Sequence, residues 1–355
     1  MKPVKFGICG LGRIGFVHAR HFSGEKAMYE LVAGCDRDQQ RAGKLAEQYK
    51  CASYDNFEEF LKNPDMELAI IATRSLDHAG NAVQALAAGK YVLLEKPVAV
   101  TSDDFRKLKR ADKKYPGRLF FLHNHRFEPA FRNIRAMISS GVLGDIQVVK
   151  LCRHHPFRRR ADWQSLLGCG GGQLSCWGPH LIDQALQYIG APVRDVWSYL
   201  KRIVTPGDAD DHMRIMIVGE NGVVAELEVS DAVALPGAYC TVYGSRGTLV
   251  CADEKNIRLK YIDPEYKLPE ITASASQPPL AGGYGNEEII PWVEKNVKVE
   301  PDTNMWEQVE IDIARHLYRA IRENIPFPVK NSEALEVVRV TEIVKNQNRQ
   351  FKWKK

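Results

Sequence analysis

Lys96 is a candidate functional residue because of its type and its position in the chain. It follows an apolar run, Tyr91–Leu94, and comes directly before Pro97. The run is typical of a buried parallel strand, and a residue before proline is pushed toward extended geometry. In open α/β sheets ligands bind beyond the carboxyl ends of the strands, so a lysine there could donate a hydrogen bond to a ligand. This stretch alone favours a solvated Lys-Pro turn, but the remainder of the chain reverses that preference.

His180 is the second such residue and lies in a glycine-rich stretch, residues 168–183. Glycines there would let the backbone approach a neighbour or a ligand closely, and a histidine exchanges protons near neutral pH. Asp183 follows three residues later and would share a helix face with His180. The stretch by itself leaves two interpretations equal: a proton-transferring histidine, or a buried histidine whose hydrogen bonds Asp183 satisfies.

The N-terminal third contains the elements that would hold a nucleotide beside these residues. A predicted strand over residues 4–9 runs into a G-x-G-x-x-G motif, and helix-compatible residues 16–22 follow. Glycines in this motif make the tight turn, admit the pyrophosphate and let the helix pack on the strand, while the helix N-terminus faces the phosphates. The loop residues expected at the cofactor are Gly10, Gly12, Arg13, Ile14 and Gly15.

A second predicted strand, residues 31–35, ends at Asp36. An acidic residue about 20 residues past the glycines completes the dinucleotide-binding fingerprint, because its carboxylate accepts a hydrogen bond from the adenosine ribose. The same carboxylate would repel the 2′-phosphate of NADP, which favours NAD. Arg37 comes next in the chain and could receive that phosphate. NAD is therefore the expected cofactor, and NADP stays open.

Strands and helices alternate over the rest of this third. Strands are predicted over residues 67–72, 91–94 and 119–122, and helices over 38–49, 75–88 and a stretch that opens at Thr101 with a capping-box pattern. Such alternation indicates a parallel sheet covered by helices on both faces. We therefore expect a Rossmann domain over residues 1–123. His78, in the helix that follows Thr73, is either a cofactor contact or, as its position alone favours, a solvent-facing residue.

Beyond residue 124 the pattern changes to many strands and few helices. A helix is predicted over residues 129–139 and two more close the chain, 305–323 and 332–347; strands are predicted over 146–153, 193–203, 212–218, 223–230, 239–244, 248–252 and 257–261. Many of these strands alternate apolar and polar residues, which suits a largely antiparallel sheet with one buried face. Residues 262–304 have weak periodicity and are expected to form loops. The second domain, residues 124–355, is thus predicted to be α/β with a large open sheet.

Size, charge and cysteine content limit the function classes. The chain has 355 residues, a formal net charge of +5 and 8 cysteines without a C-x-x-C pair. This length allows two domains, the mild charge demands no nucleic acid, and scattered cysteines indicate a reducing compartment. No stretch approaches the roughly 20 apolar residues of a membrane span, and no set of metal ligands is recognisable. We expect a soluble cytoplasmic protein without nucleic-acid or membrane partners.

Five motifs of this chain occur together in one known family. They are Gly10–Gly15, Ala87–Lys90 leading to Glu95–Pro97, Gly170–Gly172 leading to His180–Asp183, Gly244–Leu249, and Pro326–Val329. With them the chain resembles, essentially end to end, the glucose–fructose oxidoreductase, inositol dehydrogenase and rhizopine-catabolism (Gfo/Idh/MocA) family. The resemblance implies a Rossmann domain and a C-terminal α/β domain whose open sheet often makes oligomer contacts. It also implies oxidation or reduction at a secondary hydroxyl of a sugar or cyclitol, with the family's lysine and histidine at Lys96 and His180.

Three positions depart from the family pattern. Cys176 stands four residues before His180, where the family usually has an aspartate. A thiol with an ordinary pKa of about 8.5 cannot replace a carboxylate in orienting the histidine or sharing its proton. Thr73-Arg74 stands where the family has Thr-Pro and adds positive charge near the cofactor, and Asp36-Arg37 leaves NAD against NADP undecided.

The resemblance and the chemistry of alcohol oxidation together give a hypothesis for the site. Nicotinamide takes a hydride from carbon, His180 takes the hydroxyl proton, and Lys96 stabilises the developing alkoxide. Substrate contacts are expected from Asn124, Arg126, His155, Trp163, Cys176 and Asp183; cofactor contacts outside the glycine loop are expected from Asp36, Arg37, Thr73, His78 and Glu95.

Two other functions fit the same residues. A redox-assisted glycosidase or sugar lyase would oxidise a hydroxyl only transiently and turn over without net NADH. A nucleotide-sensing regulator would keep the fold and lose the chemistry, which Cys176 favours and the retention of both Lys96 and His180 opposes. The strands after residue 146 exceed what the remaining helices could cover, so we expect a homodimer or homotetramer packed through that sheet.

Overall fold

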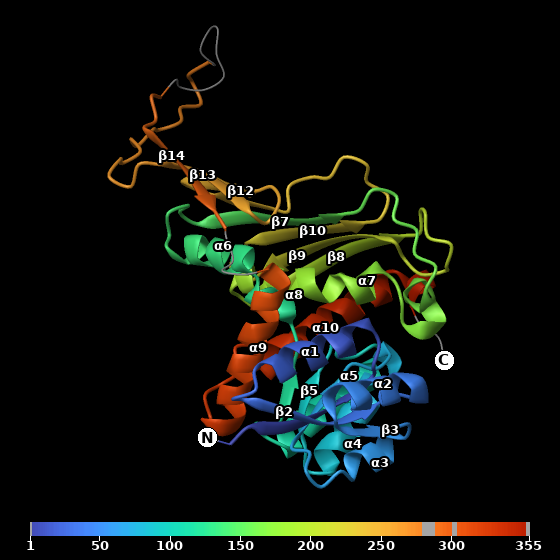
Figure 1. The fold of residues 1–355 in the computed structure, drawn as a ribbon. Helices are drawn as coiled ribbons and strands as arrows, with labels where there is room; N and C mark the ends of the chain where they lie inside the picture. Colours follow the sequence, from blue (N-terminus) through green and yellow to red (C-terminus); the bar gives the residue numbers. More distant parts are fainter. Residues whose placement is uncertain (1, 279–287, 300–303, 353–355) are drawn as a thin grey trace.

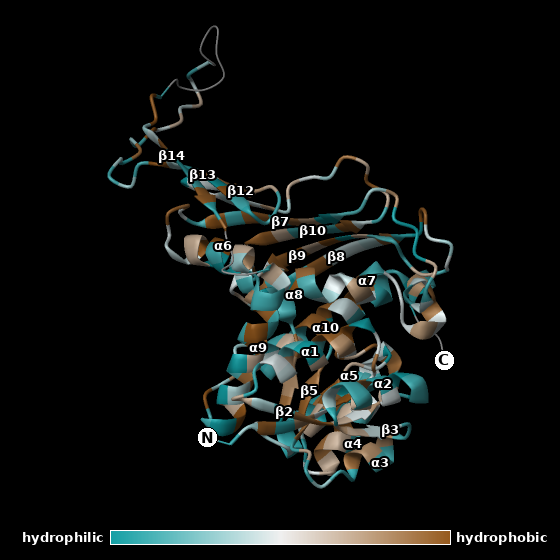
Figure 2. Cartoon of the chain, viewed as in Figure 1, coloured by the Kyte–Doolittle hydropathy of each residue, from teal (hydrophilic) through white to brown (hydrophobic). Residues whose placement is uncertain are grey.

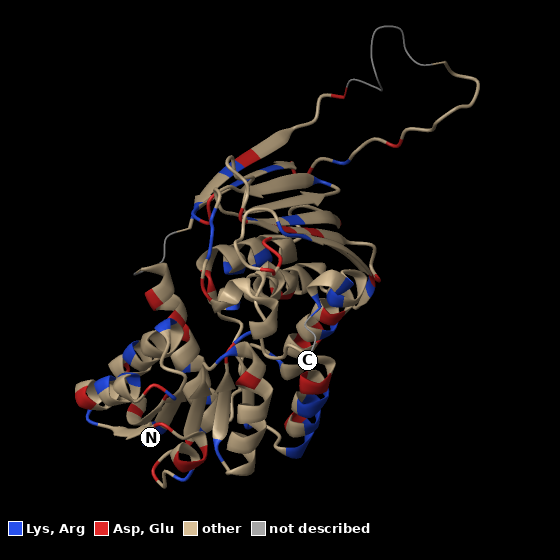
Figure 3. Cartoon of the chain, turned by 90° about the vertical axis from the view of Figure 1, so that its right-hand side faces the viewer, with Lys and Arg blue, Asp and Glu red and all other residues tan. Residues whose placement is uncertain are grey.

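Two sheets stand one above the other in the computed structural model, with helices between them (Figure 1). The structure describes residues 2–278, 288–299 and 304–352. Within these ranges no helix is both long enough and apolar enough to cross a lipid bilayer. Lys and Arg are interspersed with Asp and Glu over both halves of the molecule (Figure 3).

The N-terminal sheet has six parallel strands in the order β3-β2-β1-β4-β5-β6. This is the doubly wound order, in which ligands bind where the strand order reverses, beyond the carboxyl ends of the strands. The expected Rossmann domain is confirmed. Its strands are β1 Val4–Cys9, β2 Tyr29–Cys35, β3 Ala52–Tyr54, β4 Leu68–Ile71, β5 Tyr91–Leu94 and β6 Leu119–Phe121; its helices are α1 Arg13–Gly24, α2 Gln39–Tyr49, α3 Phe57–Leu61, η1 Ser75–Asp77, α4 His78–Ala87 and α5 Ser102–Lys114.

The second sheet has eight strands in the order β14-β13-β12-β11-β7-β10-β9-β8, and every neighbouring pair is antiparallel except β7 and β10. The expected open, mainly antiparallel sheet is confirmed. Its strands are β7 Ile146–His154, β8 Val193–Lys201, β9 His212–Gly219, β10 Val224–Ser230, β11 Cys240–Gly244, β12 Gly247–Cys251, β13 Asn256–Ile262 and β14 Trp292–Lys298. The expectation of loops throughout residues 262–304 was wrong for β14, an edge strand in which most residues are exposed.

One face of this sheet is covered and the other is open. The covered face packs against α6 Pro129–Ser139, α8 Gly178–Ile189 and part of α10 Asn331–Gln347. Hydrophobic residues concentrate in the strands and in α10, which lies between the two sheets (Figure 2). The open face carries exposed Trp197, Tyr199, Met216 and Tyr243. The shorter elements are η2 Asn124–Phe127, η3 Trp163–Ser165, η4 Leu167–Cys169, α7 Gln173–Cys176 and η5 Arg349–Phe351.

Helix α9, Met305–Arg322, returns to the N-terminal domain. Its apolar residues Val309, Ile313 and Leu317 are buried in the same core as the Rossmann strands, and the Tyr29 hydroxyl donates to the Ala314 carbonyl at 2.7 Å. The apolar face of α9 is therefore covered by the Rossmann core, although the helix lies within residues 124–355, the range expected for the second domain.

Candidate active site

The glycine loop between β1 and α1 is shaped by close backbone approaches. A Cβ atom at Gly10, where φ is +95°, would lie 2.4 Å from the Ala72 carbonyl oxygen, and one at Gly15 would lie 2.0 Å from the Gly10 carbonyl oxygen. At Gly12 a Cβ atom would meet nothing within 4 Å, and no side chain caps the N-terminus of α1. The loop therefore leaves open space and uncapped N–H groups at the helix start, which fits the pyrophosphate of a dinucleotide.

Asp36 is held at the end of β2 by the same loop. Its Oδ2 atom accepts a hydrogen bond from the Leu11 N–H at 2.7 Å, and its Oδ1 atom accepts one from the Asp38 N–H at 3.0 Å. Each oxygen keeps a further lone pair with which it could accept from a ribose hydroxyl. The Arg37 side chain is 78% exposed and its Nη2 atom lies 3.9 Å from Asp77. The residues thus fit NAD, and Arg37 is free enough to meet an added phosphate.

Replacing Asp36 by alanine should weaken NAD binding by about 10- to 100-fold, since a hydrogen bond to a charged group contributes about 1.5–3 kcal/mol. NADP binding should weaken less, because the repulsion of its phosphate is also removed. The dissociation constants of both cofactors would be measured by fluorescence titration. Arg37→Ala is the matched control and should weaken NADP alone. An unchanged ratio of the two constants in Asp36→Ala would contradict this role for the carboxylate.

Lys96 joins the end of β5 to the glycine-rich segment of the second domain. Its backbone N–H donates to Glu95 Oε2 at 2.9 Å, and its ammonium donates to the Cys176 carbonyl at 3.0 Å, across 80 residues of sequence. The peptide bond to Pro97 is cis. Because its ammonium contacts the Cys176 carbonyl, the lysine head lies at the carboxyl edge of the Rossmann sheet and faces the segment that contains His180.

His180 lies in the first turn of α8 and is only 4% exposed. Its ring centroid is 3.8 Å from that of His125, and its Nδ1 atom has no hydrogen-bond partner within the described part of the chain. Burial lowers the pKa of His180 well below its usual value, and the neighbouring His125 and Lys96 lower it further. The ring is thus neutral at pH 7, the form that can accept a proton, and Lys96 is near enough to influence it.

Arg126 and Asp183, two expected substrate contacts, bind each other in the structure. The Arg126 guanidinium donates from Nε to Asp183 Oδ2 at 2.7 Å and from Nη2 to the other carboxylate oxygen, and its Nη1 atom pairs with Glu333. Arg126 and Asp183 are buried. The two residues form a buried ion pair, and Asp183 does not satisfy His180, whose Nδ1 atom has no hydrogen-bond partner among the described residues.

Three expected cofactor contacts have partners within the chain. His78 is buried, with Nδ1 2.8 Å from the Pro97 carbonyl oxygen and Nε2 3.1 Å from that of Thr73. The ring does not face solvent and both of its nitrogens have partners, so it links the segments that follow β4 and β5. The Glu95 carboxylate is bound to His18 and to the Lys96 N–H. The Thr73 hydroxyl accepts from Asn81 at 3.3 Å.

The remaining expected substrate contacts have different settings. Cys176 is half-buried and its Sγ atom is 3.8 Å from Arg160 Nη1, so it faces a cation. Asn124 Oδ1 is a buried acceptor without a partner within the described residues. His155 Nδ1 lies 2.9 Å from an Asp231 oxygen, and Trp163 is half-buried at the start of η3.

An aromatic cluster that sequence reasoning missed surrounds His180. The His125 ring lies 5.2 Å from the Trp177 ring and 5.5 Å from the Trp306 ring, and Trp177 lies 5.7 Å from His180. His125 Nδ1 is 2.7 Å from the buried carboxylate of Glu128. Neighbouring histidines at positions 123 and 125 were the one local signal, because the contacts with Trp177 and Trp306 join residues far apart in sequence.

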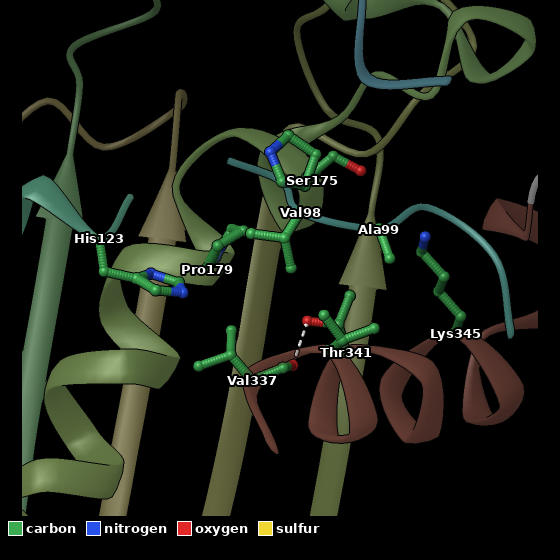
Figure 4. Close-up of a pocket in the computed structure, with 10 residues that line it drawn as sticks. Val98, Ala99, His123, Ser175, Pro179, Val337, Thr341 and Lys345 are labelled. Atoms are coloured by element: carbon green, nitrogen blue, oxygen red, sulfur yellow. Dashed lines mark hydrogen bonds between the residues drawn. The ribbon is translucent and has the colours of Figure 1, made fainter. Parts of the chain in front are cut away.

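A small cavity lies beside Pro97, next to the segments that contain Lys96 and His180. Its volume is about 10 Å³, and His123 points into it toward Pro179 (Figure 4). A cavity of that size holds about one water molecule, so a sugar cannot bind there. Its lining is Pro97, Val98, Ala99, His123, Ser175, Pro179, Val337, Val338, Thr341 and Lys345.

Comparisons with known proteins agree on one family. The oxidoreductase family with an NAD-binding Rossmann fold matches residues 4–123, and the GFO/IDH/MocA C-terminal domain matches residues 131–250. The chain is 27% identical over 292 residues to scyllo-inositol 2-dehydrogenase (NADP(+)) IolW from Bacillus subtilis, covering 80% of this chain and 77% of the relative.

Two solved structures share the fold. An NAD-binding protein from Listeria innocua has a TM-score of 0.79 at 22% identity and covers 98% of this chain and 95% of its own. The WlbA dehydrogenase from Bordetella pertussis, solved with NADH and UDP-GlcNAcA, has a TM-score of 0.77 at 17% identity. The match covers 98% of this chain and 96% of the WlbA chain. The match of residues 4–123 to the family model identifies the N-terminal domain as an NAD-binding Rossmann domain, as expected from the sequence.

Proposed function

Because this chain belongs to the Gfo/Idh/MocA family of oxidoreductases, we propose that it is an NAD(P)-dependent dehydrogenase of a sugar, a sugar derivative or an inositol. It would transfer a hydride between nicotinamide and a secondary hydroxyl of that substrate. The observation that carries the proposal is the placement of Lys96. Its ammonium lies beyond β5, at the carboxyl edge of the sheet, which is the edge where a doubly wound sheet binds its ligands, and contacts the segment that presents His180.

Lys96 and His180 have different roles in the oxidation of the substrate hydroxyl. A bound nicotinamide supplies the hydride acceptor. Lys96 donates a hydrogen bond to the substrate oxygen and stabilises the negative charge that develops there, at no reorganisation cost because its position is already fixed. His180, kept neutral by burial and by nearby positive charge, accepts the hydroxyl proton. Cys176 contributes no carboxylate, so His180 works without the usual acidic partner.

Two tryptophans support a cyclic substrate. Trp177 and Trp306 flank His125 beside His180, and an aromatic ring suits the apolar face of a sugar or cyclitol. Asn124 Oδ1, a buried acceptor, could then bind one of the ring hydroxyls. The Bacillus subtilis relative is a scyllo-inositol 2-dehydrogenase, which supports this class of substrate.

The test is a screen of sugars and cyclitols in which reduced nicotinamide is followed by absorbance and products are analysed in parallel. A dehydrogenase forms one reduced cofactor per oxidised substrate. Product without net NADH would instead indicate a redox-assisted glycosidase or lyase. Cofactor binding without turnover on any member of the panel would indicate a nucleotide-sensing regulator.

The protein should form a homodimer or homotetramer through the open face of the eight-stranded sheet. Exposed Trp197 and Tyr199 lie on neighbouring outward positions of β8, and exposed apolar patches of this kind mark interfaces. Trp197→Glu should lower the mass observed by sedimentation velocity to that of a monomer. The control is Leu235→Glu, at an 89% exposed position outside the strands, which should leave the mass unchanged. A monomeric wild-type protein would contradict the expected interface.

A further inference from the structure

His18 lies between two glutamates that come from distant parts of the chain. Its Nε2 atom is 2.8 Å from Glu95 Oε1, just after β5, and its Nδ1 atom is 2.9 Å from Glu310 Oε2, in α9. All three are buried: His18 is 1% exposed, Glu95 8% and Glu310 4%. Buried charges destabilise a protein unless they are paired, so this cluster is built around mutual contacts.

The His18 ring is positively charged in this setting. An ionised carboxylate only accepts hydrogen bonds, so a ring with a carboxylate at each nitrogen carries a proton on both. Burial acts to lower the pKa of His18, but the charges and hydrogen bonds of Glu310 and Glu95 outweigh it and raise that pKa to about 10. Burial likewise acts to raise the pKa of Glu95, yet His18 and Lys96 hold it below its usual value.

Glu95 connects the charged ring to Lys96. One of its oxygens faces His18, and the other accepts the backbone N–H of Lys96 at 2.9 Å. The Lys96 ammonium is held separately by the Cys176 carbonyl. Because His18 fixes the orientation of the Glu95 carboxylate, it also fixes the backbone from which the Lys96 side chain extends.

Helix α9 contacts the other side of the site as well. Trp306 precedes Glu310 by one helical turn, so the two side chains share a face. The Trp306 ring lies 5.5 Å from the His125 ring, which lies 3.8 Å from the His180 ring. The same face of α9 therefore meets the surroundings of Lys96 through Glu310 and those of His180 through Trp306.

We propose that His18 and Glu310 are positioning residues, through which α9 sets the placement of Lys96 relative to His180. The effect on turnover rests on the proposed function, whereas the placement of Lys96 does not. His18 and Glu310 are 292 residues apart in the sequence. Alignment of the site therefore depends on the docking of the C-terminal part of the chain against α1, whose N-terminus forms the cofactor loop.

Other titratable groups near the cluster cannot replace either glutamate. His21 of α1 and Glu307 of α9 occupy partly exposed or exposed positions on the two helices. Burial lowers the pKa of His78 and His123, the two rings whose protonation Glu95 influences, so both are neutral at pH 7. His18 is thus the cationic ring of the cluster, and Glu310 is its partner on α9.

Glu310→Gln is the decisive variant because it keeps an oxygen that can accept from His18 and removes the charge. The pKa of His18 should fall from about 10 toward neutral pH, which an NMR titration of isotope-labelled histidine would show. If Lys96 then loses its fixed position, kcat should fall by about 10- to 100-fold with the affinity for NAD unchanged. The pH profile of kcat should gain an ionisation that the wild type lacks. Glu307→Gln is the matched control on the same helix and should change none of these quantities.

The stability of the protein provides a second signature. The folded-state pKa of His18 lies above its ordinary value of 6.5, so the stability that this charge contributes is complete below pH 6.5 and is lost as the pH rises through about 10. In Glu310→Gln that loss should begin at lower pH. Urea titrations at several pH values would measure it and would identify the range in which both proteins are folded.

Two results would overturn the proposal. One is a kcat and pH profile of folded Glu310→Gln that match those of Glu307→Gln, since the cluster would then only stabilise the fold. The other concerns the NMR signal of Lys96 in samples whose lysines are methylated, a signal that Lys96→Arg would assign. The proposal fails if this signal is the same in Glu310→Gln and in the wild type. The NMR measurement needs no substrate. A wild type inactive toward every polyol would therefore contradict the proposed function, while the placement of Lys96 by His18 would still be tested.

Discussion

Lys96→Ala should lower kcat by about 100- to 1,000-fold, the usual loss when one preorganised donor to a developing oxyanion is removed. The dissociation constant of NAD should stay nearly unchanged, because the ammonium contacts the Cys176 carbonyl in the free protein and acts on the substrate oxygen in the transition state. Initial rates of reduced nicotinamide formation and a separate binding titration would give the two quantities. Lys62→Ala, which removes an exposed lysine of the same domain, should leave both at wild-type values.

Two further variants define how Lys96 and His180 share the chemistry. His180→Ala should also lower kcat, with a loss that shrinks at high pH as solvent base takes the proton. Cys176→Asp would restore the carboxylate that the family usually has and should preserve or raise the rate. Full activity in Lys96→Ala would exclude the proposed mechanism, whatever family the chain belongs to.

Asp183→Asn should destabilise the protein by about 3–5 kcal/mol, the usual cost of leaving a buried charge without its partner. Arg126 would keep only Glu333, and the pair that joins η2 to α8 would be lost. The free energy of unfolding from urea titrations would measure the change. Glu333→Gln is the matched control, since Glu333 is 28% exposed and its loss should cost clearly less.

A double substitution separates the pair from the packing around it. Arg126→Met with Asp183→Leu removes both charges and keeps apolar volume, so it should recover much of the stability lost in Asp183→Asn. A value for Asp183→Asn within about 1 kcal/mol of the wild type, in the range of an ordinary surface substitution, would contradict a structural role. Asp183 would then be open again to a direct contact with the substrate.

The sequence by itself determined the elements whose signals are local. The glycine loop and Asp36 predicted the dinucleotide site because the turn, the helix start and the ribose-binding acid lie within one βαβ unit. Helix α6 occupies the predicted residues, Pro129–Ser139, since proline at its start and its apolar period are both readable in a short window. Edge strand β14 was missed because most of its residues are exposed, and alternation identifies a strand only when one face is buried.

Only the tertiary structure decided which charged side chains face a ligand and which bind each other. Arg126 and Asp183 look like substrate contacts in the sequence, yet they are buried and paired. The partners of Glu95 and His78 likewise come from other segments.

The same physical reason explains what the sequence left out. His18, His125, Trp306 and Glu310 surround the site through contacts that span up to 292 residues. A hydrogen bond between residues so far apart leaves no periodic pattern in the sequence. The sequence also does not distinguish a buried carboxylate from an exposed one. The motifs shared with the family therefore pointed to Lys96 and His180, whereas their neighbours and the contacts of α9 followed from how the two ends of the chain pack together.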